Sequence, residues 1–253
     1  MRSKELKINS TGIPIKVWLF SPDTLRRNLL PAVVLCHGIP SSIPDPKDRG
    51  YMPLVESVVD LGFHCVFFNF RGCGDSHGNI DMEGWYEDLC AVLEEAYGIP
   101  GIDPSSLHLL GFSAGGAIAV KVAALDDRVK SVMTMATPAN FSVIVPPDPD
   151  FLRQYFFEIG LIKEDSFPPD TRTWYDTFLE LDTPRWISFV SPRNVCIVHG
   201  DKDTLVPVEH AKRIYSAAGR PKKIVILENA PHQLRKDHRI IPLIKEWLRE
   251  VAS

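Results

Sequence analysis

The chain has 253 residues and a formal net charge of −4, with acidic and basic residues interspersed along it. This length suits a single α/β domain, and the charge pattern argues against a nucleic-acid-binding surface. No apolar run approaches the roughly 18 residues that cross a bilayer, and the first residues lack the apolar stretch of a signal peptide. Composition therefore predicts a cytoplasmic protein with no membrane span and no nucleic-acid partner, and it carries no signal about oligomeric state.

The five cysteines do not form a recognisable framework. Their number is odd and no Cys-x-x-Cys pair occurs, while Cys36, Cys65 and Cys196 fall inside predicted strands, where a free thiol behaves as a small apolar residue. The sequence therefore predicts no disulfide, no metal site and no cofactor.

Apolar periodicity and turn residues divide the first half of the chain into regular elements. In chain order they predict an antiparallel edge hairpin at 5–20 that contains Pro14, a strand at Ala32–Cys36, a helix at 54–61, a strand at His64–Phe70, a helix at 82–97, a strand and helix within Leu107–Ala119, and a strand at Ser131–Ala136. The strands are continuously apolar, which is typical of strands covered on both faces.

The alternation of strand and helix stops between about residues 138 and 190. Prolines there separate two aromatic-rich helical patterns at Phe151–Ile159 and Thr171–Leu179. We interpret 138–190 as a small helical cap inserted into a core formed by 1–137 and 191–253, and the alternative is a plain crossover helix with long loops. The alternation then resumes with a strand at Val195–His199, a helix at 208–217, a strand at Lys223–Leu227 and a helix at 239–251.

This order predicts an α/β fold with a mostly parallel, doubly wound sheet and helices on both faces. Ligands bind such sheets beyond the carboxyl ends of the strands, and the polar motifs of this chain fall at those ends.

One motif, Gly111-Phe-Ser-Ala-Gly115, lies between the apolar strand and the small-residue helix of Leu107–Ala119. A serine at the tip of so tight a turn is held in strained geometry, and Gly111 and Gly115 are needed because side chains there would collide with neighbouring backbone. The motif predicts that Ser113 is exposed at the sheet edge. The alternative is a glycine-rich connection that binds nothing.

A serine hydroxyl becomes a strong nucleophile when an imidazole accepts its proton and a carboxylate orients that imidazole. The strand at Val195–His199 leads into a loop with Asp201 and Asp203, and the strand at Lys223–Leu227 leads into a loop with His232. Ser113, Asp203 and His232 occur in the chain order expected for this turn. Asp201 is the alternative acid.

From Pro31 onward the chain resembles the α/β-hydrolase superfamily, in particular small-capped serine esterases and serine-peptidase-like hydrolases. The resemblance rests on His37-Gly38, Arg71-Gly-x-Gly-x-Ser76, Gly111–Gly116, His199-Gly-x-x-Asp203-x-x-Val-Pro207 and Ala-Pro-His232. It departs from that branch at Asn69, where an Asp usually precedes the arginine in a loop-bracing position.

The resemblance implies roles for individual residues. Ser113 corresponds to the nucleophile, Asp203 to the acid and His232 to the base, while the backbone N–H groups of Ile39 and Ala114 correspond to the oxyanion hole. It implies hydrolysis of carboxylic esters through an acyl-enzyme, with a small acyl compound as substrate. Amide or thioester cleavage with the same triad, or a retired catalyst that only binds a ligand, are the alternatives.

The remaining candidates have structural interpretations. We interpret Arg71 as a loop anchor, His37, His64 and His108 as hydrogen-bonded core residues, and His210 and His238 as surface groups. The cap aromatics Tyr155, Phe156, Trp174 and Phe178 are interpreted as packing residues first, with Phe156, Trp174 and Phe178 also lining a substrate pocket. Glu158 and Glu164 are candidates for holding a substrate amine.

Overall fold

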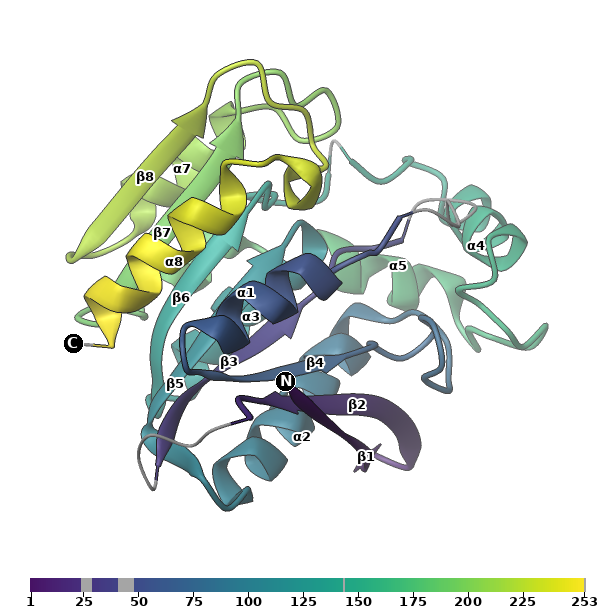
Figure 1. The fold of residues 1–253 in the computed structure, drawn as a ribbon. Helices are drawn as coiled ribbons and strands as arrows, with labels where there is room; N and C mark the ends of the chain where they lie inside the picture. Colours follow the sequence, from purple (N-terminus) through teal and green to yellow (C-terminus); the bar gives the residue numbers. More distant parts are fainter. Residues whose placement is uncertain (24–28, 41–47, 143, 253) are drawn as a thin grey trace.

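The computed structural model describes residues 1–23, 29–40, 48–142 and 144–252. These residues form an eight-stranded sheet in the order β1-β2-β4-β3-β5-β6-β7-β8 (Figure 1). The strands are β1 (Arg2–Ser10), β2 (Ile13–Ser21), β3 (Leu30–Cys36), β4 (His64–Phe68), β5 (Ile102–Phe112), β6 (Val129–Met135), β7 (Asn194–Gly200) and β8 (Lys222–Leu227). β2 runs antiparallel to β1 and to β4, and all other neighbours are parallel. The predicted mostly parallel α/β fold is therefore confirmed.

The N-terminal hairpin forms as predicted, with β1 as the edge strand and β2 as its inner neighbour. β2 pairs with β4 only over Val17–Phe20, whereas Pro14 lies earlier in β2, opposite Asn9 of β1. Proline has no N–H to donate to a ladder. Pro14 is tolerated because it precedes the stretch in which β2 has strands on both sides.

The helices cover both faces of the sheet (Figure 1). They are α1 (Met52–Asp60), α2 (Met82–Gly98), α3 (Ala114–Leu125), α4 (Pro149–Glu158), α5 (Thr171–Leu179), α6 (Thr183–Ile187), α7 (Glu209–Ala217) and α8 (Ile240–Val251). Apolar residues of α1 and α8 pack in one core cluster, and those of α2, α3 and α7 pack in a second cluster on the opposite face. None of the helices within the described ranges is long and apolar enough to cross a membrane.

β4 ends two residues earlier than the predicted strand, at Phe68 instead of Phe70. The cause is a change of hydrogen-bond partner, because the N–H of Phe70 donates to Nε2 of His37 at 3.1 Å and leaves the sheet ladder. The apolar run continues through Phe70, which is fully buried. The pattern of apolar residues therefore could not show that the strand ends at Phe68.

The segment 138–190 contains α4, α5 and α6, and its described residues form no strand. The short helix α6 was not predicted, because five residues are too few to show helical periodicity. Hydrogen bonds connect the segment to the chain that follows β4: Ile80 N–H donates to the Leu161 carbonyl at 2.9 Å, and the indole N–H of Trp174 donates to the Ile80 carbonyl at 2.8 Å. The segment is therefore fastened to the core at its middle as well as at its ends.

Candidate active site

Ser113 lies at the turn between β5 and α3 with φ 50° and ψ −124°, a conformation that non-glycine residues rarely adopt. A Cβ on Gly111 would come within 2.4 Å of the Gly116 Cα, and a Cβ on Gly115 within 2.1 Å of the His37 carbonyl oxygen. No side chain fits these distances. The structure therefore has the strained turn that the motif predicted, and both glycines are required by close backbone approach.

Three side chains from different loops meet at this turn. His232 Nε2 lies 3.1 Å from Ser113 Oγ, and His232 Nδ1 lies 2.7 Å from Asp203 Oδ2. The carboxylate holds the ring proton on Nδ1, which leaves Nε2 to accept a proton from the serine. The structure thus brings together the three residues that the sequence selected for proton transfer from Ser113.

Asp203 is the carboxylate that reaches His232, and it is held as an anion. Burial by itself raises its pKa, but hydrogen bonds from His199, His232 and the Val206 N–H outweigh burial and keep that pKa well below its usual range. Asp201, the alternative acid, lies in the turn that begins the loop, where its N–H donates to the Leu227 carbonyl. Of the two aspartates, Asp203 is therefore the one that contacts His232.

Ala114 and Ile39, the two residues expected to form an oxyanion hole, belong to segments that meet at Ser113. Ala114 is the first residue of α3, and the first N–H groups of a helix have no acceptor inside it. The loop after β3 approaches so closely that a Cβ on Gly38 would be 2.9 Å from Ser113 Cβ, which places the following Ile39 near the same point.

His37 fixes the peptide that carries the Ile39 N–H. Its Nε2 accepts from the Phe70 N–H, so its proton is on Nδ1, which donates to the Gly38 carbonyl at 2.7 Å. In a trans peptide the N–H points opposite to the carbonyl, so the Ile39 N–H points away from the His37 ring. Burial lowers the pKa of His37 to about 4, which keeps this tautomer neutral.

The interpretation of Arg71 as a loop anchor is confirmed. Its guanidinium donates to Asp88 at 3.0 Å from Nε and 2.8 Å from Nη2, and it also reaches Ser10, Thr11 and Glu87. Asp88 is completely buried in α2. The arginine therefore joins the loop after β4 to α2 and to the N-terminal hairpin.

Most of the histidine predictions are confirmed: His108 contacts Ser106 and Ser131, and His238 is exposed. For His64 the prediction of a hydrogen-bonded ring holds only in part, because Nδ1 contacts Ser21 while the buried Nε2 has no hydrogen-bond partner in the described part of the chain. His210 was predicted to lie on the surface, and this was wrong. It is buried on the inner face of α7, where its Nδ1 accepts from the Ala139 N–H at 3.0 Å, because α7 packs against the chain that leaves β6.

The aromatic side chains of segment 138–190 pack mainly on one another. Ring centroids are 6.1 Å apart for Phe156 and Trp174, and 5.2 Å apart for Trp174 and Phe178, and all three rings are buried. This confirms their packing role. Tyr155 and Phe151, also from α4, are instead exposed. Glu158 and Glu164 are both exposed, and Glu158 accepts from Gln154 on the same helix.

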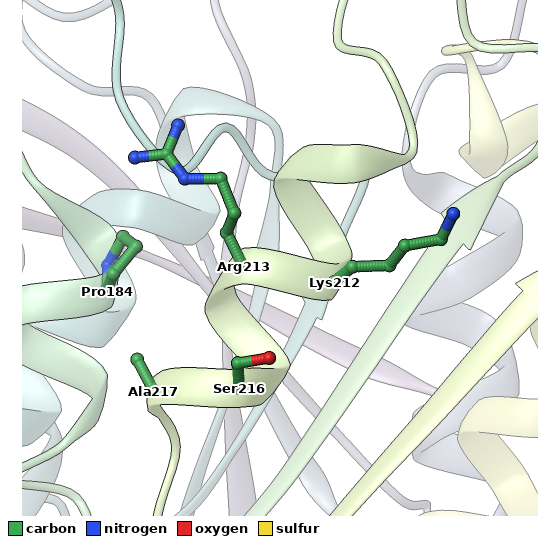
Figure 2. Close-up of a pocket in the computed structure, with 5 residues that line it drawn as sticks. All are labelled: Pro184, Lys212, Arg213, Ser216 and Ala217. Atoms are coloured by element: carbon green, nitrogen blue, oxygen red, sulfur yellow. The ribbon is translucent and has the colours of Figure 1, made fainter.

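A hollow of about 530 Å³ lies between α6 and α7 and is lined by Pro184, Lys212, Arg213, Ser216 and Ala217. Figure 2 shows that the Lys212 and Arg213 side chains point away from each other, so their charges do not converge on one point. Within the described parts of the chain, no group of three or more His, Cys, Asp or Glu side chains is arranged to hold a metal ion. The candidate site therefore remains the one at Ser113.

One residue at the site received no role from the sequence. His199, at the end of β7, is completely buried, and its Nε2 lies 3.3 Å from Asp203 Oδ2. The sequence signal was its place in the motif His199-Gly-x-x-Asp203, but the spacing alone did not show that the ring turns back toward the carboxylate.

The sheet order, the strained serine turn and the histidine and aspartate loops define an α/β-hydrolase architecture. The family model described as alpha/beta hydrolase fold matches residues 31–188, and the chain belongs to this family. It is 23% identical over 224 residues to the uncharacterized protein YfhR of Escherichia coli K12, covering 87% of this chain and 70% of that protein.

Solved structures show the same fold. The α/β hydrolase GrgF from Penicillium sp. sh18 superposes with a TM-score of 0.78 and 18% identity, covering all of both chains. Est1E from Butyrivibrio proteoclasticus, in a structure with ferulic acid bound, superposes with a TM-score of 0.72 and 20% identity, covering 97% of this chain and 96% of that chain. At these sequence identities, the two superpositions show that the fold is shared and nothing further.

Proposed function

We propose that this protein is a serine hydrolase that cleaves carboxylic esters of small acyl compounds through an acyl-enzyme intermediate. The observation that carries the proposal is the continuous hydrogen-bonded path from Ser113 Oγ through His232 to Asp203, with distances of 3.1 and 2.7 Å. Nucleophile and base within hydrogen-bond reach, with the base oriented by a third group, is the arrangement that activates a serine.

In the proposed reaction Ser113 Oγ attacks the ester carbonyl carbon while His232 Nε2 accepts the hydroxyl proton. The N–H groups of Ile39 and Ala114 stabilise the negative oxygen of the tetrahedral intermediate. His232 then donates the proton to the leaving alcohol, and the acyl group stays on Ser113. Water, deprotonated by His232, attacks the acyl-enzyme, and release of the carboxylic acid restores the serine.

We further propose that segment 138–190 acts as a cap that selects the acyl group, with Phe156, Trp174 and Phe178 shaping an apolar pocket. Support comes from the position of the segment directly after β6, one of the strands beside Ser113, and from its aromatic packing. Apolar walls with few polar groups are typical of small-molecule sites.

The decisive experiment is labelling with a fluorophosphonate, which reacts with activated serines. Labelling of the wild type that is lost in Ser113→Ala supports the proposal, and turnover by Ser113→Ala or His232→Ala should fall by about four to six orders of magnitude. Ser105→Ala, which changes an exposed serine beside Asp103, is the matched control and should label normally. Labelling of the wild type at a serine other than Ser113 would refute the assignment.

Ester cleavage is favoured over amide cleavage because neither Glu158 nor Glu164 is buried at a site that could hold a substrate amine. A panel of p-nitrophenyl esters, aminoacyl-p-nitroanilides and acyl-CoA thioesters separates these activities. Faster turnover of anilides or thioesters than of esters would replace the ester assignment and leave the triad assignment in place.

A further inference from the structure

His199 is a second histidine in contact with Asp203, and the proposed mechanism leaves it without a function. Its ring is completely buried at the carboxyl end of β7. Nε2 lies 2.8 Å from the Val206 carbonyl oxygen and 3.3 Å from Asp203 Oδ2. Nδ1 is buried and has no hydrogen-bond partner within the described structure.

These contacts determine the protonation state of the His199 ring. Both neighbours of Nε2 are acceptors, so Nε2 carries the proton. A second proton on Nδ1 would be a buried donor with no acceptor, which is strongly unfavourable. The His199 ring is therefore neutral. Its single Nε2–H donates to the Val206 carbonyl at 2.8 Å, and the same nitrogen lies 3.3 Å from the Asp203 oxygen that His232 also contacts.

The two oxygens of Asp203 have different partners. Oδ1 accepts from the N–H groups of Leu205 at 3.0 Å and Val206 at 2.8 Å. Oδ2 accepts from His232 Nδ1 at 2.7 Å and faces His199 Nε2 at 3.3 Å. His199 is thus the only side chain besides His232 that contacts this oxygen among the residues described. The backbone donors hold one end of the carboxylate, and His199 restrains the end that orients the base.

We propose that His199 is a positioning residue for the hydrolysis described above. Its Nε2–H, anchored on the Val206 carbonyl, places positive charge density 3.3 Å from Asp203 Oδ2, which keeps that oxygen in line with His232 and partly offsets its negative charge. The inference rests on the proposed function. The proposal explains the motif His199-Gly-x-x-Asp203 physically: the histidine at the end of β7 supports the aspartate in the loop that follows.

The charge effect has a defined sign. Titratable groups face the Asp203 carboxylate from three elements: His199 on β7, His210 on α7 and His232 in the loop after β8. Without the His199 donor, the full charge of Oδ2 acts on His232 and stabilises its protonated form. Because protonated His232 cannot accept the serine proton, the acid limb of the pH–rate profile moves to higher pH.

The test compares His199→Phe, which removes the donor, with His199→Gln, whose side-chain amide reaches the position of Nε2. We expect His199→Phe to lower kcat about tenfold with little change in KM, and to move the acid limb up by about half a pH unit to one unit. His199→Gln should restore most of both. Wild-type kinetics in folded His199→Phe, or equal impairment in the Phe and Gln variants, would overturn the proposal.

Two further variants control for folding. His108→Phe removes a buried histidine of β5 that contacts Ser106 and Ser131, and it should leave the pH profile unchanged. If His199→Phe does not fold, His199→Asn is measured instead, because the asparagine side-chain amide is too short to reach Asp203 Oδ2. We expect His199→Asn to shift the acid limb as described, and equal behaviour of the Asn and Gln variants would overturn the proposal.

A readout without turnover separates this inference from the proposed function. The ring protons of His232 can be titrated by NMR in the wild type and in the His199 variants. If Ser113 is not labelled by fluorophosphonate, the proposed function fails, yet an upward shift of the His232 titration in His199→Phe still supports the contact. An unchanged titration in the folded variant contradicts it.

Discussion

Substituting Gly115 with alanine sets two well-understood effects against each other. Gly115 lies in the first turn of α3, where alanine normally favours the helix by about 0.5–1 kcal/mol. The new Cβ, however, would lie 2.1 Å from the His37 carbonyl oxygen and 2.8 Å from that of Cys36. Both contacts are backbone atoms at the end of β3, so no side-chain rotation can relieve them.

The magnitude follows from the size of the displacement. Carbon and oxygen atoms normally approach to somewhat more than 3 Å, so α3 and the loop after β3 must separate by about 1 Å. Overpacking in a rigid core costs about 1–3 kcal/mol, and displacement of backbone belongs at the upper end of that range. After subtracting the helix preference, we expect Gly115→Ala to lower the free energy of unfolding by about 2 kcal/mol.

The assay is urea unfolding at neutral pH, combined with the rate of fluorophosphonate labelling. The matched control is Gly98→Ala at the end of α2, where an added Cβ has no neighbour within 4 Å and should be neutral or slightly stabilising. Because the same displacement moves Gly38 and Ile39 away from Ser113, labelling should slow in Gly115→Ala alone. Unchanged stability and labelling in this variant would refute the close-approach argument.

Three other predictions test the surroundings of the site. Arg71→Lys cannot reproduce the paired contacts with buried Asp88 and should lower the free energy of unfolding by about 2–3 kcal/mol in urea melts, and a loss below the measurement error would contradict the anchoring role. Burial lowers the pKa of His108 to about 4, so as pH falls His108 takes up a proton in the unfolded protein before it does so in the folded protein. The free energy of unfolding should therefore decline by up to about 1.4 kcal/mol per pH unit between roughly pH 6.5 and 4. Urea melts of His108→Gln should show a shallower decline. Trp174→Phe keeps the aromatic packing but removes the hydrogen bond to the Ile80 carbonyl. The relative kcat/KM across a series of ester chain lengths should therefore change, while fluorophosphonate labelling of Ser113 persists. An unchanged chain-length profile would contradict a role of segment 138–190 in substrate selection.

The sequence by itself determined the order of the strands, the order of the helices other than α6, and the identity of the serine turn. These features depend on local spacing: continuous apolar runs make buried strands, and Gly111 and Gly115 permit backbone contacts that side chains would prevent. Chain order and the requirements of serine activation were also enough to select His232.

Only the tertiary structure decided which groups meet. Ser113 and His232 are 119 positions apart. Their contact depends on the sheet, in which β5 and β8 run parallel with two strands between them and end on the same side. The choice between Asp201 and Asp203 depended on how one loop turns toward that histidine. His210 and His199 have polar side chains in patterns that also suit a surface, and their burial follows from the packing of α7 and β7 against other segments. Local sequence fixes which conformations each segment can adopt, whereas contacts between distant segments depend on the packing of the whole sheet and its helices.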